Sequence, residues 1–365
     1  MSKFSGNRRI RVLVIDDSAF NRKVIGEMIS SDRALELAGT ASCGDEGLKK
    51  VLELEPDIIT LDLEMPRMDG YTFLRLLMNR RPTPVIVISS HSQRHNVFKA
   101  LELGALDFVA KPVNQLSSDL YCIKDEVLAK LKLVSQLRRH PWSVVAESSK
   151  LEQRVAEPQS APTPSGVAVV AIGASTGGPR AIQHVLQHAA PGACYLVAQH
   201  MPAGFTRAFA ERLDRMVDLD VVEAKGGERL RPGLVLVAPG GNDLVIVKRG
   251  EHLLTRLKQP EPGVNYVPSV DRLFESVARV TGSGCMAVVL TGMGSDGKKG
   301  IIEVKNHGGI TVAESEDSAV VFGMPKEAMD TGFVDYVASL DELPGIIGEF
   351  VARMRKDMGR QDDIA

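Results

Sequence analysis

The chain has 365 residues, enough for two domains at roughly 150 residues each. Hydrophobic residues make up 44% of the sequence and charged residues 25%, which is typical of globular proteins. The net charge of −2 and the lack of any apolar run near the ~18 to 20 residues of a membrane helix predict neither nucleic-acid binding nor membrane insertion.

The cysteines and the N-terminal residues indicate the cellular compartment of the protein. The four cysteines are widely spaced and form no CxxC pair, so a metal site or a disulfide framework is not expected. The first residues show no apolar core or cleavage site of a secretory signal. We therefore expect reduced thiols and a cytoplasmic protein.

Residues 8–137 alternate between strand and helix patterns five times. The predicted strands are residues 11–17, 36–42, 57–63, 84–90 and 107–111, and an amphipathic helix follows over about 116–137. Ser117, Ser118 or Asp119 is expected to cap that last helix. Strands separated by helix-length segments predict right-handed βαβ units, and hence a doubly wound α/β domain with a parallel sheet.

Polar side chains stand at the carboxyl ends of these predicted strands. Asp16 and Asp17 end the first strand, Asp62 ends the third, Ser89 the fourth and Lys111 the fifth. Because ligands bind at that edge of a parallel sheet, we expect these side chains to meet. Three clustered carboxylates repel one another unless a cation neutralises them, and Mg²⁺ binds a few carboxylates while keeping water for a phosphate. The pattern predicts a phosphoryl-transfer site.

Each residue of this predicted site has a specific role. Asp62 would attack phosphorus as a carboxylate nucleophile, while Lys111 and the Ser89 hydroxyl would bind the phosphoryl group. The metal ligands would be Asp16, Asp17, Asp62 and the backbone carbonyl of Glu64. The alternative is that Asp16 and Asp17 only cap a helix and Lys111 is a surface charge. The match of five residues to the strand ends favours the site.

Four segments of this half resemble two-component receiver domains. They are Ile15–Asp17, Leu61–Gly70, Ser89–Ser90 and Phe108–Pro112. The resemblance implies a flavodoxin-like fold and a histidine kinase as the phosphodonor to Asp62. It also implies that Ser89 holds the family's Ser or Thr position and that Phe108 is the aromatic switch residue.

Residues 138–166 separate the two halves. Helix and strand periodicity stop here, and prolines and serines recur. This composition predicts an extended, partly flexible linker.

The second half opens with a strand, a glycine turn and a helix. Val167–Ile172 is a continuous apolar run, which predicts a strand buried on both faces of a parallel sheet. Gly173–Gly177 then fits G-x-S-x-G, and Pro179 suits the first turn of a helix. The arrangement predicts a nucleophile elbow that exposes the Ser175 hydroxyl. Two alternatives are a dinucleotide fingerprint, although Ser175 stands where its second glycine should be, and a purely structural turn.

Parallel-sheet units continue to about residue 358. Further strands are predicted at residues 193–200, 221–224, 234–238, 243–248, 286–290 and 309–313. Helices are predicted at residues 181–189, 205–213, 270–280 and 297–306. Residues 167–358 are therefore expected to form a second doubly wound α/β domain.

The same strand-end rule brings a serine, a histidine and a carboxylate together. Ser175 follows one strand, His200 ends the next, and Asp296 lies just past a third. Such a set predicts acyl transfer, in which the serine attacks, the histidine moves the proton and the aspartate orients the imidazole. The alternative role for Asp296 is to cap the helix that follows it, and both roles can coexist.

Motifs throughout this half resemble chemotaxis protein-glutamate methylesterases. They are Gly173–Gly178, Gln199–Met201, Leu290–Gly297 and Gly323–Pro325. The resemblance implies a hydrolase that demethylates glutamate methyl esters and deamidates certain glutamines on the cytoplasmic helices of methyl-accepting chemoreceptors. It assigns Ser175, His200 and Asp296 to the triad, gives the Met293 N–H as an oxyanion donor, and implies no cofactor in this domain.

Together the two halves predict a serine hydrolase activated by phosphorylation during chemotaxis adaptation. We expect the unphosphorylated receiver to limit access to the catalytic crevice, and phosphorylation of Asp62 to shift that equilibrium. One alternative is a response regulator that binds DNA, but no helix-turn-helix or basic stripe is visible. Another is an interaction module with an inactive elbow, which only the completeness of the triad argues against.

Overall fold

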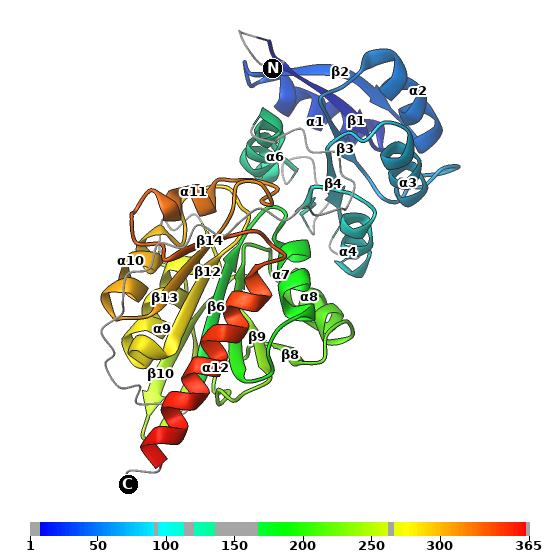
Figure 1. Ribbon diagram of the computed structural model, residues 1–365. Coiled ribbons are helices and arrows are strands. Elements are labelled where there is room, and N and C mark those ends of the chain that lie inside the picture. The colour runs from blue at the N-terminus through cyan, green and yellow to red at the C-terminus, as the bar shows by residue number, and fades with distance from the viewer. Residues whose placement is uncertain (1–7, 91–93, 113–119, 136–166, 262–265, 363–365) are drawn as a thin grey trace. The chain divides into compact units, whose positions relative to one another are not determined.

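A computed structural model describes residues 8–90, 94–112, 120–135, 167–261 and 266–362 (Figure 1). The chain divides into two units, residues 1–147 and 148–365, and each contains its own parallel sheet. The predicted linker at residues 138–166 and the predicted cap at 117–119 lie outside the described residues. Among the helices of the described part, none is long and apolar enough to cross a membrane.

The first unit is a five-stranded parallel sheet with the strand order β2-β1-β3-β4-β5. Its strands are β1 (Ile10–Ile15), β2 (Leu35–Ala41), β3 (Ile58–Leu61), β4 (Val85–Ser89) and β5 (Asp107–Ala110). Its helices are α1 (Ala19–Ser30), α2 (Gly44–Leu54), α3 (Gly70–Arg80), α4 (Arg94–Glu102) and α6 (Lys124–Lys132). The consecutive residues Val12–Ile15 of β1 are all buried, so both faces of this interior strand are covered. The predicted α/β class is confirmed.

The predicted helix over residues 116–137 is confirmed in its described part, residues 120–135, although 3₁₀ turns form its two ends. A 3₁₀ turn at Tyr121–Ile123 precedes α6, and a second one at Leu133–Ser135 follows it. Ile123, Val127 and Leu131 are buried at helix-like spacing, so the sequence pattern resembles one helix. The tighter 3₁₀ turns change the path of the backbone without breaking this apolar face.

The second unit is a seven-stranded parallel sheet with the strand order β14-β13-β12-β6-β7-β9-β8. Its strands are β6 (Ala168–Ala174), β7 (Ala193–Gln199), β8 (Asp220–Glu223), β9 (Leu234–Val237), β12 (Cys285–Val289), β13 (Ile310–Glu314) and β14 (Tyr336–Ala338). Its helices are α7 (Gly178–Gln187), α8 (Phe205–Asp214), α9 (Val270–Thr281), α10 (Lys298–Asn306), α11 (Met324–Met329) and α12 (Leu343–Asp362). Figure 1 shows α12 crossing in front of this sheet, where it packs on β6 and α7.

One predicted strand of this half belongs to a different sheet. β10 (Asp243–Arg249) pairs antiparallel with β11 (His252–Lys258) in a two-stranded hairpin outside the parallel sheet. Gly250 adopts a φ of +59° in the two-residue turn, a conformation that suits glycine. An apolar run alone does not distinguish a hairpin strand from a parallel one, so the pairing was not predicted.

The four cysteines are free thiols in the structure. Cys43, Cys194 and Cys285 are buried, whereas Cys122 is exposed. Burial raises the pKa of the Cys194 thiol to about 12 and that of Cys285 to about 11. These two thiols are therefore unreactive core residues.

Candidate functional site

Strand register brings the predicted catalytic residues to one edge of the second sheet. On one side of β6, Gly173 lies opposite Val289, and on the other side Ala174 lies opposite Gln199. Ser175 directly follows the last residue of β6, and His200 directly follows the last residue of β7. The His200 N–H donates to the Ala174 carbonyl at 3.0 Å, so the two residues leave adjacent strands together.

The predicted strand, turn and helix around Ser175 are present. β6 ends at Ala174 and α7 begins at Gly178, with Gly177 at a φ of +81° between them. The left-handed conformation therefore falls on a glycine and not on the serine. Position 178 has no room for a side chain, because a Cβ there would lie 2.0 Å from Oε1 of Gln199.

Gln199 supports the serine turn, a role that the sequence did not indicate. Its Nε2 donates to the carbonyl of Ser175 at 2.9 Å and to that of His200 at 3.2 Å. The side chain is buried and ties together the carboxyl ends of the two strands that carry the serine and the histidine. Gln199 immediately precedes His200 at the end of a predicted strand, and this position is the one feature of the sequence that could have suggested its role.

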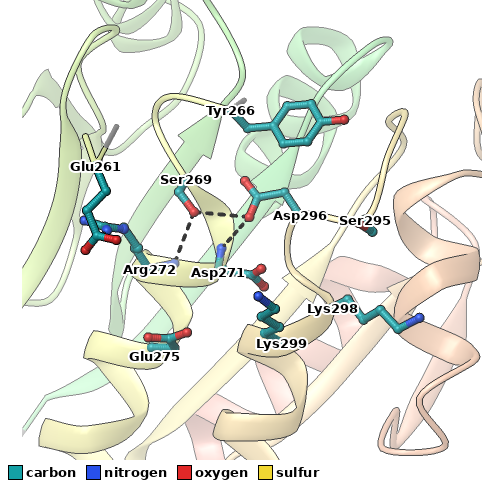
Figure 2. A pocket seen from close by; sticks show the side chains of 10 residues that line it. All are labelled: Glu261, Tyr266, Ser269, Asp271, Arg272, Glu275, Ser295, Asp296, Lys298 and Lys299. Atoms are coloured by element: carbon teal, nitrogen blue, oxygen red, sulfur yellow. Dashed lines mark hydrogen bonds and ion pairs between the residues drawn. The ribbon is translucent and has the colours of Figure 1, made fainter. Parts of the chain in front are cut away.

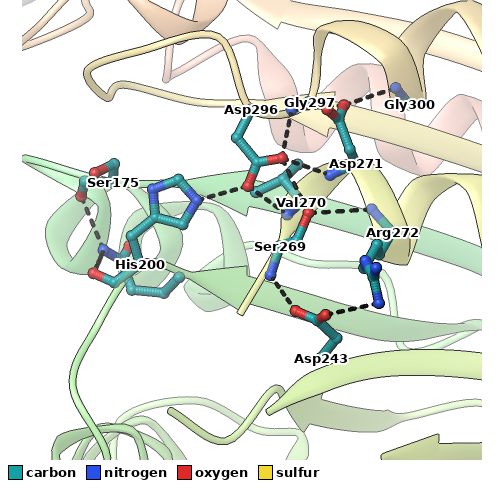
Figure 3. Close-up of polar contacts among 11 residues, drawn as sticks. Ser175, His200, Asp243, Ser269, Val270, Asp271, Arg272, Asp296, Gly297 and Gly300 are labelled. Carbon is teal, nitrogen blue, oxygen red and sulfur yellow. Dashed lines mark hydrogen bonds and ion pairs between the residues drawn. The ribbon is translucent and has the colours of Figure 1, made fainter. Parts of the chain in front are cut away.

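His200 and Asp296 are joined by a hydrogen bond (Figure 3). His200 Nε2 lies 2.8 Å from Asp296 Oδ2. A carboxylate can only accept, so Nε2 carries the proton and Nδ1 keeps a lone pair. Nδ1 is buried and has no hydrogen-bond partner in the structure. The imidazole thus presents a free acceptor of the kind that a serine hydroxyl needs for activation.

Asp296 is also the anchor of another helix. Its carboxylate accepts from the backbone N–H of Val270 at 2.7 Å and of Asp271 at 2.9 Å, and from the Ser269 hydroxyl at 3.2 Å. Burial raises the pKa of Asp296, but the His200 hydrogen bond and the backbone donors outweigh burial and hold this pKa below its usual range. The carboxylate is therefore ionised at neutral pH and fixed in place.

The predicted capping role of Asp296 needs correction. Asp296 accepts from Gly297 at 3.1 Å, but its main cap is on the N-terminus of α9 and not on the helix that follows it. The start of α10 is capped instead by Asp271, whose Oδ1 accepts from Gly297 at 2.9 Å and from Gly300 at 2.8 Å. Each aspartate therefore caps the helix that the other one adjoins: Asp296, which precedes α10, caps α9, and Asp271, which lies in α9, caps α10 (Figure 3). Only tertiary packing brings these groups together.

Asp271 was not predicted as part of the site. Burial raises the pKa of Asp271 to about 6. The Gly300 N–H lowers this pKa, and the nearby charge of Asp296 raises it further. An acidic residue in the first turn of a helix is a common feature, so this role could not be predicted from Asp271 alone.

A buried glutamate organises the loop beside Ser175. Glu314 ends β13, is 1% exposed, and accepts from the Thr291 N–H at 2.8 Å and from the Ser318 hydroxyl at 2.9 Å. The Thr291 carbonyl in turn accepts from the Ser175 N–H at 3.0 Å. The strand-end rule, applied to the predicted strand at 309–313, would have identified Glu314.

The loop carrying Met293 follows Thr291 directly. Two backbone hydrogen bonds hold Gly292. The Gly292 N–H donates to the Val321 carbonyl at 3.0 Å, and the Met324 N–H donates to the Gly292 carbonyl at 2.8 Å. A Cβ on Gly292 would lie 2.8 Å from the Cβ of Ser175, so the loop touches the serine. Among the residues that the structure describes, no acceptor binds the Met293 N–H.

Glu314 provides a pH-dependent prediction. Burial, opposed by the Thr291 N–H and the Ser318 hydroxyl, raises its pKa to about 7, above the ordinary 4.5. The folded state therefore binds this proton more tightly than the unfolded chain, and its contribution to stability is lost as pH rises through about 7. Between about pH 5 and about pH 8, Glu314→Gln should gain up to about 3 kcal/mol relative to wild type.

Urea unfolding at several pH values would measure this difference. Glu316→Gln, which removes an exposed carboxyl two residues away, is the matched control and should follow the wild-type profile. A Glu314→Gln profile parallel to the wild type would contradict the prediction.

The first unit gathers the residues predicted for phosphoryl transfer. Oxygen atoms of the Asp16, Asp17 and Asp62 carboxylates lie within 4.8 Å of one another. Lys111 Nζ lies 3.0 Å from Asp16 Oδ2 and 2.5 Å from Asp62 Oδ2. Burial raises the pKa of Asp62 to about 6, with Lys111 lowering it and Asp16 raising it. This oxygen-only, crowded donor set fits a hard divalent cation such as Mg²⁺.

The remaining predicted residues surround this cluster. Ser89 is buried at the end of β4, and its carbonyl accepts from the Lys111 N–H at 2.7 Å. The Glu64 N–H donates to Asp62 Oδ1 at 3.4 Å. Phe108 is buried on β5, with Lys130 Nζ 5.5 Å from its ring centroid. Ser89 and Lys111 thus lie at the carboxyl ends of β4 and β5, where the strand-end rule places them.

Comparisons with known proteins agree with both halves. Residues 170–347 match the family model CheB methylesterase, and residues 12–118 match the response regulator receiver domain. Protein-glutamate methylesterase/protein-glutamine glutaminase 3 of Geobacter sulfurreducens is 47% identical over 356 residues, covering 92% of this chain and 96% of that protein. Protein-glutamate methylesterase/protein-glutamine glutaminase 1 of Myxococcus xanthus is 47% identical over 351 residues, covering 95% of this chain and 98% of that protein.

A solved structure is also similar to the second unit. The crystal structure of the Thermotoga maritima CheB methylesterase catalytic domain has 38% sequence identity and a TM-score of 0.49, and covers 51% of this chain and 98% of its own. The identities and coverage of the two relatives confirm the predicted resemblance: this chain belongs to the protein-glutamate methylesterase/protein-glutamine glutaminase family, hydrolases of the CheB type, and carries a response regulator receiver domain.

Proposed function

We propose that this chain hydrolyses glutamate methyl esters, and deamidates glutamines, on cytoplasmic helices of methyl-accepting chemoreceptors through Ser175, His200 and Asp296. The observation that carries the proposal is the His200–Asp296 hydrogen bond, which leaves the buried Nδ1 of His200 without a partner at the serine edge of the sheet. Both the charge and the geometry of this pair suit a general base.

The reaction follows from these positions. As Ser175 Oγ attacks the ester carbonyl, its proton moves to His200 Nδ1, and Asp296 stabilises the imidazolium through Nε2. The Met293 N–H donates to the oxyanion of the tetrahedral intermediate. Collapse breaks the bond to the leaving group, which takes the proton from His200 and departs as methanol, or as ammonia from a glutamine. Water then attacks the acyl-enzyme, and His200 again accepts and returns the proton.

The receiver half would control this activity. We expect a chemotaxis histidine kinase to donate a phosphoryl group to Asp62, with Lys111 and Ser89 binding its oxygens and Phe108 responding as the switch residue. Mg²⁺ would be held by Asp16, Asp17 and Asp62 and by the Glu64 carbonyl, and when bound it neutralises the phosphoryl charge.

The domain organisation completes the proposal. The receiver would span residues 8–137, the linker 138–166 and the catalytic domain 167–358, all in the cytoplasm. The unphosphorylated receiver would limit access by a helical substrate, and phosphorylation would favour the open arrangement.

Methanol release from membranes bearing methylated receptors tests the proposal. A small phosphodonor such as acetyl phosphate should raise the wild-type rate, whereas Asp62→Asn should keep its basal rate and incorporate no phosphate. Asparagine is nearly isosteric but cannot form an acyl phosphate. Asp69→Asn, a helix-cap aspartate outside the cluster, is the matched control and should still respond. Full activation of Asp62→Asn by the phosphodonor would refute receiver control through this residue.

A further inference from the structure

An aromatic ring covers one face of the proposed general base. Tyr266 stacks on His200 with 4.7 Å between ring centroids and 12° between ring planes. The tyrosine lies three residues before Ser269, in the segment whose next residues donate to Asp296. One short stretch of chain therefore contacts both the imidazole and its carboxylate partner.

The same tyrosine lines a cavity beside the site. The cavity has a volume of about 460 Å³ (Figure 2). Its lining residues include Tyr266, Asp296, Asp271, Arg272, Glu275 and Lys299. So many charged groups in a space of this size provide partners for several water molecules. Tyr266 contacts His200 and also lines the cavity, whereas His200 does not line it, so the phenol ring lies between the imidazole and the cavity.

Tyr266 also contacts the loop that follows Met293. Gly294 has a φ of +94°, and a Cβ built on it would lie 2.5 Å from Tyr266 Oη and 3.0 Å from Cζ. The absence of a side chain at Gly294 leaves room for the phenol. The tyrosine thus packs between the general base and the loop of the proposed oxyanion donor.

We propose that Tyr266 is a positioning residue for the reaction, an inference that rests on the proposed roles of Ser175 and His200. The hydrogen bond from Nε2 to Asp296 fixes one end of the imidazole but leaves the ring free to tilt about that bond. Stacking on a flat aromatic surface holds the plane of the ring, which lies between Asp296 and Ser175 (Figure 3), and so would keep Nδ1 on the serine side. Small displacements of a catalytic group cost large factors in rate, so this restraint affects kcat.

Three variants of Tyr266 test the inference. Tyr266→Phe keeps the stacked ring and should retain kcat within about threefold, whereas Tyr266→Leu removes the flat surface and should lower kcat about 10- to 100-fold. KM should change by less than about threefold, because the lost restraint acts on the base and not on substrate binding. Tyr266→Met fills the space with a flexible side chain and should resemble the leucine variant, which covers the case in which Tyr266→Leu does not fold.

A second readout separates positioning from substrate docking. The sulfonylation rate of Ser175 by a small sulfonyl fluoride, in which the serine oxygen displaces fluoride, should fall in Tyr266→Leu by the same factor as kcat when measured on the full chain. Glu275→Gln alters a cavity-lining residue that does not contact His200 and should leave both rates unchanged.

The outcomes distinguish this inference from the proposed function. Wild-type kcat and a wild-type sulfonylation rate in Tyr266→Leu and Tyr266→Met, or a rise in KM alone, would overturn the positioning role. Equal loss in Tyr266→Phe would also overturn it, since the stack survives in that variant. If wild type itself neither reacts with the sulfonyl fluoride nor releases methanol, the proposed triad fails, and the inference fails with it.

Discussion

Replacing Ser175 with alanine is expected to lower kcat for methanol release by on the order of a millionfold. The variant removes the only atom that forms the acyl-enzyme, and His200 Nδ1 then has no hydroxyl to deprotonate. What remains is the donor at Met293 and substrate binding, which are worth roughly a thousandfold over water in other serine hydrolases. Methanol release from methylated receptor membranes measures the loss.

The matched control is Ser295→Ala. Ser295 is an exposed serine in the Met293 loop that lines the cavity and is not at the end of β6. This control should retain the wild-type rate, and both variants should keep the wild-type unfolding midpoint. Normal activity in Ser175→Ala would make the elbow a structural turn and leave the family's reaction to other residues of this chain.

The second large effect is expected at Asp296. Asp296→Asn should lower kcat by about ten-thousandfold, as removal of the charged partner does in comparable triads. An asparagine amide can donate to Nε2, which moves the imidazole proton to Nδ1. The nitrogen that should accept the serine proton would then carry one already. The pH-independent part of the kcat profile measures this loss.

The capping role of Asp296 makes a stability control necessary. The carboxylate accepts from Val270 through Oδ2 and from Asp271 through Oδ1, so an asparagine can accept only one of these bonds and leaves the other N–H facing its amide nitrogen, at a cost of about 1 kcal/mol. Asp271→Ala removes the carboxylate that caps α10 and does not bond to His200. It should lose comparable stability while keeping kcat within about tenfold. Equal loss of kcat in both variants would mean that Asp296 acts through helix capping alone.

Much of the fold and of both sites could be predicted because the decisive signals are local. Apolar runs separated by helix-length segments specify parallel strands, and parallel strands place their carboxyl ends at one edge. That rule alone brought Asp62 and Lys111 together in one half, and Ser175 and His200 in the other. The structure has these residues at those edges.

Other features depend on which surfaces meet after the strands and helices have formed. Periodicity shows that an element has an apolar face but not what covers it. The exchange of caps between Asp271 and Asp296 is of this kind, and so is the pairing of β10 with β11. Each joins segments through contacts that no local pattern records.

Local patterns along the chain were sufficient to predict the two parallel sheets, their order, and the residues at their carboxyl edges. Packing between distant segments is what joins His200 Nε2 to Asp296, places Glu314 against the Thr291 turn, and puts Tyr266 over the imidazole. The difference arises because strand and helix formation follow from neighbouring residues. The orientation of a side chain, and the partner of a buried polar group, depend on packing between distant segments.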